Sequence, residues 1–121
     1  MLKLNLPHRE PLRFAKHIIH VDNDIAIVKN EFTSIPSLAM LVEAAAQSSA
    51  ALNDDDLKGG IGYVASIKNI KLLQQPTSLD FHIHIKLASK LGNIGNFSFE
   101  SFQTKDKNTT IATGSFVVVS V

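Results

Sequence analysis

The chain contains no cysteine, and aromatic side chains make up only 7% of its 121 residues. The absence of cysteine excludes disulfides, thiolate-bound metals and a cysteine nucleophile, and it fits a reducing cytoplasm. The few aromatic residues are not interleaved with basic ones, so a platform for stacking nucleic-acid bases is not expected. The formal net charge of +1 gives no broad positive field for nucleic acid or anionic membranes. We therefore expect a cytoplasmic protein that binds no nucleic acid.

No segment of the sequence has the composition of a signal peptide or a membrane span. Residues 1–11 lack the apolar stretch of about 7–15 residues that secretory signals contain. Residues 35–53 are nearly long enough to cross a bilayer, but Glu43 and Gln47 make this stretch a poor candidate. The length and the apolar share of 45% instead fit one globular domain over residues 1–121.

The order of hydrophobic patterns predicts an α+β domain with one long helix. The expected strands cover residues 12–21, 25–32, 61–73, 79–88, 93–104 and 109–121. After the second strand, a helix is predicted to begin with Ser34 as its N-cap and Pro36 in its first turn, and to end at Asn53. Because this helix is hydrophobic all round, it is best buried if an antiparallel sheet curls around it.

Glu43 is the only charged side chain within residues 33–52. Burying a lone carboxylate is costly unless the group is paired, protonated or facing a cavity, so its place in an apolar helix needs a reason. Catalysis is one such reason, and a structural ion pair with Arg9 or Arg13 is the alternative. Gln47 lies one turn further on, where it can orient Glu43, donate to a substrate, or only satisfy a buried hydrogen bond.

Three stretches of the sequence resemble motifs of the beta-hydroxyacyl-ACP dehydratases, a family of hotdog-fold enzymes. Leu6–Arg9, followed by Pro11, is similar to the family's N-terminal opening. Val42–Gln47 is similar to its helix motif, and Tyr63–Lys71, followed by Pro76, is similar to its long third strand. The three motifs occur in the family's order over nearly the whole chain, so together they are more specific than any one of them.

The resemblance implies a hotdog fold, in which a five-stranded antiparallel sheet wraps around one long central helix. It also implies a homodimer with a continuous sheet, or a higher oligomer, that binds thioesters of acyl carrier protein or coenzyme A in a tunnel at the dimer interface. No cofactor and no metal ion are expected. Glu43 is similar in position to the catalytic carboxylate of the family's helix. The residues expected beside the substrate are Gln47, Ser37, Met40, Pro36 and Ser66.

The sequence lacks the second catalytic group of these dehydratases, which is a histidine in a glycine-containing loop before the helix. Residues 29–36 contain neither histidine nor glycine. Dehydration of a 3-hydroxyacyl thioester needs both a base and an acid. Thioester hydrolysis asks for less, because Glu43 can activate water while backbone amides near residues 34–37 hold the oxyanion. We therefore expect hydrolysis rather than dehydration, with two alternatives: an acyl-binding protein without catalysis, and a structural subunit that pairs with a catalytic homologue.

A metal site is the less favoured interpretation of one polar strand face. In the alternating segment 79–88, the side chains of Asp80, His82 and His84 fall on one side, opposite the apolar ones. Histidine and carboxylate are common metal ligands, but no further ligand of a matching type is identifiable. A solvated strand face is the simpler interpretation.

The remaining histidines and the lysines are weaker candidates. His17 or His20 can replace the missing base only if the fold brings one of them near Glu43, and His8 more simply ties down the N-terminal segment. Four lysines are candidates for a basic rim that meets an acidic carrier protein or a coenzyme phosphate, although most such lysines are only solvated. These are Lys68, Lys71, Lys86 and Lys90.

Overall fold

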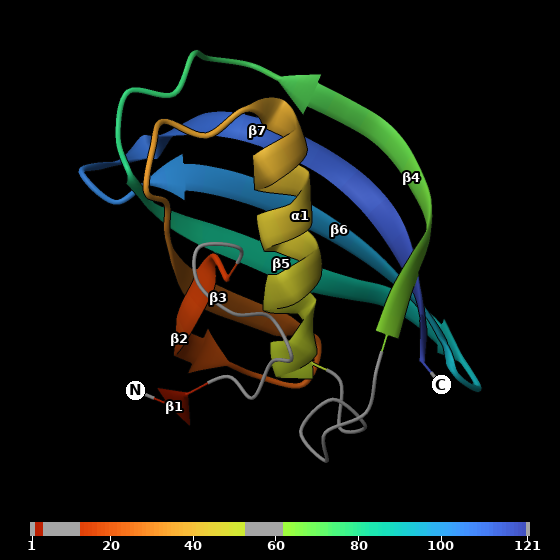
Figure 1. Ribbon diagram of the computed structural model, residues 1–121. Coiled ribbons are helices and arrows are strands. Elements are labelled where there is room, and N and C mark those ends of the chain that lie inside the picture. Colours follow the sequence, from red (N-terminus) through yellow and green to blue (C-terminus); the bar gives the residue numbers. More distant parts are fainter. Residues whose placement is uncertain (1, 4–12, 53–61, 121) are drawn as a thin grey trace.

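The computed structural model describes residues 2–3, 13–52 and 62–120 of the chain. These residues form one antiparallel sheet and one helix that crosses its concave face (Figure 1). The predicted α+β arrangement is therefore confirmed. The strands are β1 (Leu2–Lys3), β2 (Ala15–Val21), β3 (Ile25–Glu31), β4 (Gly62–Leu72), β5 (Asp80–Leu91), β6 (Ile94–Gln103) and β7 (Asp106–Ser120).

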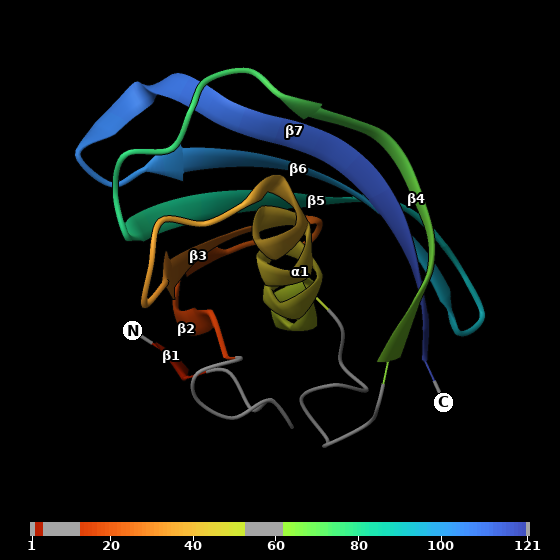
Figure 2. The same cartoon turned by 45° about the horizontal axis from the view of Figure 1, so that its top comes forward.

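The seven strands lie in the order β1-β2-β3-β5-β6-β7-β4, and all neighbours are antiparallel. The sheet is thus larger than the five strands that the resemblance implies. The two strands before the helix join the four after it, and the two-residue β1 extends one edge. β4 forms the other edge and pairs with β7 alone. Figure 2 shows the sheet curling so that β2 and β3 lie on one side of the helix and β4 on the other.

The helix α1 spans Leu38–Ser48 and continues as a 3₁₀ turn, η1, over Ser49–Leu52. Its N-cap is Ser37, whose hydroxyl accepts a hydrogen bond of 3.2 Å from a backbone N–H of the first turn. The predicted N-cap at Ser34 is wrong, because Pro36 disfavours the α conformation in the residue before it and the helix begins only after the proline. In the described part of the chain, no helix is long and apolar enough to cross a membrane.

One side of α1 packs tightly against the middle of the sheet. Leu41, Ala44 and Ala45 are fully buried there, and the small alanines let the helix lie close to the strands. The facing side chains from the strands are large and buried: Phe81, Ile83, Ile85, Phe97, Phe99 and Phe116. The alternation predicted for residues 79–88 is confirmed, because Phe81, Ile83 and Ile85 are all buried in this core. Burial of this apolar surface is the main source of stability for the fold.

A bulge in β4 directs one of its side chains toward the core. The register between β4 and β7 shifts between Lys68 and Lys71, and within this bulge Asn69 has a φ of 55°. Asparagine tolerates this left-handed conformation better than most residues. Ile70 then lies against Gly114 of β7, where an added Cβ would collide with the Ile70 Cδ1 atom. Ile70 therefore reaches the concave side and packs against the core.

Candidate functional site

A groove of about 420 Å³ runs between one face of α1 and the edge strand β4. Glu43 is the one charged residue among those that line it. The other lining residues are apolar: Leu38, Ala39, Val42 and Ala46 from α1, and Val64, Ile67 and Ile70 from β4. A mainly apolar hollow of this size with a single polar group is typical of small-molecule sites.

The groove follows from the spacing of residues on the two elements. On α1, Ala39 precedes Glu43 by four residues and Ala46 follows it by three, so the three share one face of the helix. On β4, Val64 and Ile67 pair with buried residues of β7 and therefore point to the concave side. The groove stays open toward the free edge of β4, where Val64 is 40% and Ile67 is 52% exposed.

Glu43 is exposed in the single chain. The expectation that α1 is buried on all sides, with Glu43 held away from water, is therefore wrong for the isolated subunit. The physical reason is the curl of the sheet, which covers the Leu41, Ala44 and Ala45 side of the helix but leaves the Ala39 and Glu43 side open to the groove. Arg9, one of the two arginines expected as alternative partners of Glu43, lies outside the described residues. His8, which was expected to tie down the N-terminal segment, also lies outside them.

Gln47 holds Glu43 from the adjacent turn of the helix. The Gln47 side chain is only 2% exposed, and its Oε1 atom accepts hydrogen bonds from the backbone N–H groups of Phe14 (2.8 Å) and Ala15 (3.2 Å). These two bonds fix which end of the amide is oxygen and which is nitrogen. The Nε2 atom then donates to Glu43 Oε1 at 3.3 Å. Gln47 therefore orients the carboxylate from behind and does not line the groove.

The other residues expected beside the substrate do not line the groove. Ser37 caps the helix, Met40 packs against the core, and Pro36 is buried before the first turn. Ser66 pairs with Val117 and points to the outer face of the sheet, opposite to its neighbour Ile67. The register shift between Val64 and Ser66 sets these faces, and sequence alternation alone does not reveal it.

The four described histidines lie on β2 and β5, neither of which lines the groove. His17 and His20 lie on β2, near the opposite edge of the sheet from β4. His82 and His84 lie on β5 and point away from the core, opposite to Ile83. None of these four side chains lines the groove.

His82 is less exposed than a solvated strand face would require, at 9%. Burial, followed by the charge of Lys107, lowers the pKa of His82 from its ordinary value of 6.5. Burial also lowers the pKa of His84, against an opposing effect of Glu100. Among the described residues, no group of three histidines or carboxylates is arranged to hold a metal ion.

The four lysines do not form one basic rim. Lys68 and Lys71 lie on β4, whereas Lys86 and Lys90 lie on β5, and β6 and β7 separate these two strands. Lys68 pairs with Ser115 on the outer face, so it does not face the groove. A carrier protein would therefore meet at most part of this set at one surface.

Comparison with known sequence families finds no match, and comparison with curated proteins finds none either. Solved structures with the same arrangement of strands and helix are found. The chain is similar to the dehydratase heterocomplex ApeI:P from Xenorhabdus doucetiae, with a TM-score of 0.78 and 14% identity, over 96% of this chain and 88% of that one. It is also similar to a sigma28-regulated virulence protein from Campylobacter jejuni, with a TM-score of 0.73 and 15% identity, over 98% and 92% of the two chains.

A third similar structure is a hypothetical thioesterase with coenzyme A from Streptococcus pneumoniae, with a TM-score of 0.66 and 11% identity, over 87% of this chain and 84% of that one. At such low identities the similarity identifies the fold alone. The activity must be argued from the groove and its carboxylate. The chain has the hotdog fold, as the three motifs in its sequence predicted.

Proposed function

We propose that the protein hydrolyses acyl thioesters of coenzyme A or acyl carrier protein, with Glu43 as the catalytic carboxylate. The observation that carries the proposal is the groove, which combines an apolar lining with one carboxylate. An acyl chain can bury its surface along this lining. The hydrogen bond from Gln47 holds the carboxylate in a fixed position beside the bound chain.

The reaction needs few groups. Glu43 takes a proton from a water molecule, whose oxygen attacks the carbonyl carbon of the thioester. The tetrahedral intermediate then expels the thiolate by breaking the C–S bond, and the proton passes to sulfur, which leaves a carboxylic acid and a thiol. Backbone N–H groups at the start of α1, near Leu38 and Ala39, can stabilise the oxyanion.

Hydrolysis is favoured over dehydration because the described residues that line the groove include no second acid–base group beside Glu43. Dehydration requires that one group take a proton from C2 while another gives one to the C3 hydroxyl. None of the described histidines lines the groove, and the segment before α1 contains no histidine. A single carboxylate can serve hydrolysis alone.

A second copy of the chain is the proposed cover for the open side of the groove. Among the described strands, β4 is an 11-residue edge strand that pairs only with β7, and a long edge of this kind readily adds another strand. Pairing of two β4 strands would join the sheets of two subunits. It would also cover Val64 and Ile67, which are largely exposed in the single chain. The dimer thereby supplies the water exclusion that Glu43 lacks in one subunit.

The Glu43→Gln variant tests the catalytic role. Thiol release from a series of acyl-CoA substrates should fall by about 100-fold or more, because the amide cannot act as a base. The matched control is Glu100→Gln, which changes an exposed carboxylate on the outer face of β6 and should retain activity. Circular dichroism and size-exclusion chromatography would check that both variants keep the fold and the oligomeric state.

An acyl-binding subunit without catalysis is the second candidate function. The absence of a histidine from the groove favours it, and the dehydratase similar to this chain is named as a heterocomplex. In that case acyl-CoA would raise the melting temperature of the protein while releasing no thiol. Unchanged thiol release by Glu43→Gln would overturn the catalytic role of this carboxylate.

A further inference from the structure

We infer that the acyl chain lies in the groove with its tail toward the C-terminal end of α1, and that Ala46 limits the length of the chain. This inference rests on the proposed function, since it takes Glu43 as the point where the thioester carbonyl lies. The carrier arm then leaves in the opposite direction, past Ala39. The two ends of the groove have different surroundings.

The end near the start of α1 is open to solvent. Ala39 and Ser37 are exposed, and Ile35 in the preceding loop is 49% exposed. The thioester arm of coenzyme A or a carrier protein is rich in amides, which favour contact with water. This end therefore suits the arm better than the apolar tail.

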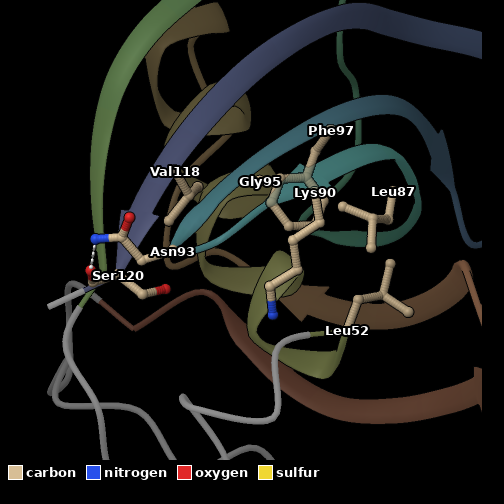
Figure 3. A pocket seen from close by; sticks show the side chains of 8 residues that line it. All are labelled: Leu52, Leu87, Lys90, Asn93, Gly95, Phe97, Val118 and Ser120. Carbon is tan, nitrogen blue, oxygen red and sulfur yellow. Dashed lines mark hydrogen bonds between the residues drawn. The ribbon is translucent and has the colours of Figure 1, made fainter.

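The described side chains leave little room at the other end of α1. Leu52, Leu87, Phe97 and Val118 surround a second hollow of only about 10 Å³, which is room for about one water molecule. Figure 3 shows these side chains gathered around the hollow, with Lys90 beside them. A tail that points this way reaches a hollow whose lining also includes Lys90, Asn93 and Ser120, polar side chains that an acyl tail does not favour.

The groove and this hollow adjoin through one cross-strand pair. Val64 lines the groove, Val118 lines the hollow, and the two residues are paired between β4 and β7. A chain that runs from Glu43 past Ala46 therefore approaches Leu52, which lies nine residues after Glu43, through the end of α1 and η1, and on the order of 15 Å along the axis. The described residues leave little space beyond that point, so we expect short and medium acyl chains to fit and long ones such as palmitoyl not to fit.

Ala46 is the position on this path where the size of a side chain would limit the length of the acyl chain. It lines the groove one turn beyond Glu43, and its methyl group leaves space that a larger side chain would fill. Ala39 offers a matched position, because it lines the same groove one turn before Glu43. Leucine is a good helix former at either site, so a substitution changes the volume of the groove without breaking α1.

The experiment compares Ala46→Leu, Ala39→Leu and the wild-type protein on acyl-CoA substrates from acetyl to palmitoyl. Ala46→Leu should move the preferred substrate to shorter chains, with a loss of kcat/KM that exceeds 10-fold at octanoyl and grows with length. Ala39→Leu should lower kcat/KM by a similar factor at every length, because it obstructs the arm that all the substrates share. Leu52→Ala should have the opposite effect to Ala46→Leu and raise kcat/KM for the longest chains.

Two results would overturn the inference. One is an unchanged length profile in both Ala46→Leu and Leu52→Ala, and the other is a profile that shifts in Ala39→Leu instead. If Ala46→Leu does not fold, Leu52→Ala decides alone. Loss of activity in Glu43→Gln together with an unchanged profile would refute only this inference. If the wild-type protein binds acyl-CoA without releasing thiol, the proposed hydrolysis fails, and the shift of melting temperature across the same substrates tests the length limit.

Discussion

The Gln47 side chain holds the Glu43 carboxylate in place through a hydrogen bond. The Gln47 amide is buried, and its oxygen accepts two backbone N–H groups at the start of β2. The nitrogen is therefore turned toward Glu43, to which it donates. In the proposed reaction Gln47 would thus be a positioning residue, whose effect passes through the carboxylate.

The Gln47→Leu variant tests this positioning role. It leaves the N–H groups of Phe14 and Ala15 without their acceptor, which should lower the free energy of unfolding by about 1–3 kcal/mol. If Gln47 positions Glu43, kcat should also fall while KM changes little, because the acyl chain still finds its apolar lining. Stability would be measured by urea unfolding and activity by thiol release.

The Ser48→Ala variant is the matched control for Gln47→Leu. Ser48 is fully buried, and its hydroxyl accepts a hydrogen bond of 3.0 Å from Asn30 Nδ2, so its loss also costs a buried polar contact. Ser48 does not line the groove. A similar loss of kcat in both variants would show that Gln47 matters only for stability.

The lowered pKa of His82 makes the stability of the fold depend on pH. Burial, then Lys107, His84 and Lys29, lower the pKa of His82 in the folded protein below 6.5. Between these two pKa values the unfolded chain binds more protons than the folded one, so stability is full above pH 6.5 and decreases as the pH falls through the lowered value. Urea unfolding of the wild type should show this decrease, and His82→Gln should show a smaller one. An equal decrease in the variant would assign the effect to other groups.

At the scale of the elements, the sequence predicted which segments are strands better than it predicted which side of the sheet their side chains face. The alternation in residues 79–88 correctly placed Phe81, Ile83 and Ile85 in the core, because β5 has regular neighbours on both sides there. In β4, register shifts change which side chains face the helix, so Ser66 points outward while Ile67 lines the groove. Such bulges depend on pairing with β7, and the local pattern of hydrophobic residues does not contain that information.

For the helix, too, the sequence predicted the element better than its starting residue and its exposed side. Pro36 explains why the observed N-cap is Ser37 rather than the predicted Ser34, and this reason is visible in the sequence. The exposure of Glu43 has no local signal, since it depends on how far the sheet curls around α1. The candidate carboxylate could therefore be found from its lone position in an apolar run, but its surroundings could not.

At the scale of the molecule, one face of the helix and one edge of the sheet are both left open, and a second copy can cover both. Glu43 and Ile67 are exposed across the groove, and β4 ends the sheet. Burial of exposed apolar side chains favours association, and the free backbone groups of β4 give it a defined geometry. The proposed dimer would therefore complete the sheet and the site in a single step.

The Ala65→Lys variant tests this dimer. Ala65 is an exposed residue within a register shift of β4, so a lysine there disturbs no pairing with β7. Two copies of the charge would meet where the edges join, and the dissociation constant should rise about 10-fold or more, as lysines on edge strands oppose pairing. Analytical ultracentrifugation across concentrations measures this shift. Ala88→Lys places the same charge at an exposed register shift of β5, an inner strand, and should leave association unchanged. If both variants dimerise with the same dissociation constant as the wild type, β4 is not the interface. The groove must then exclude water by other means.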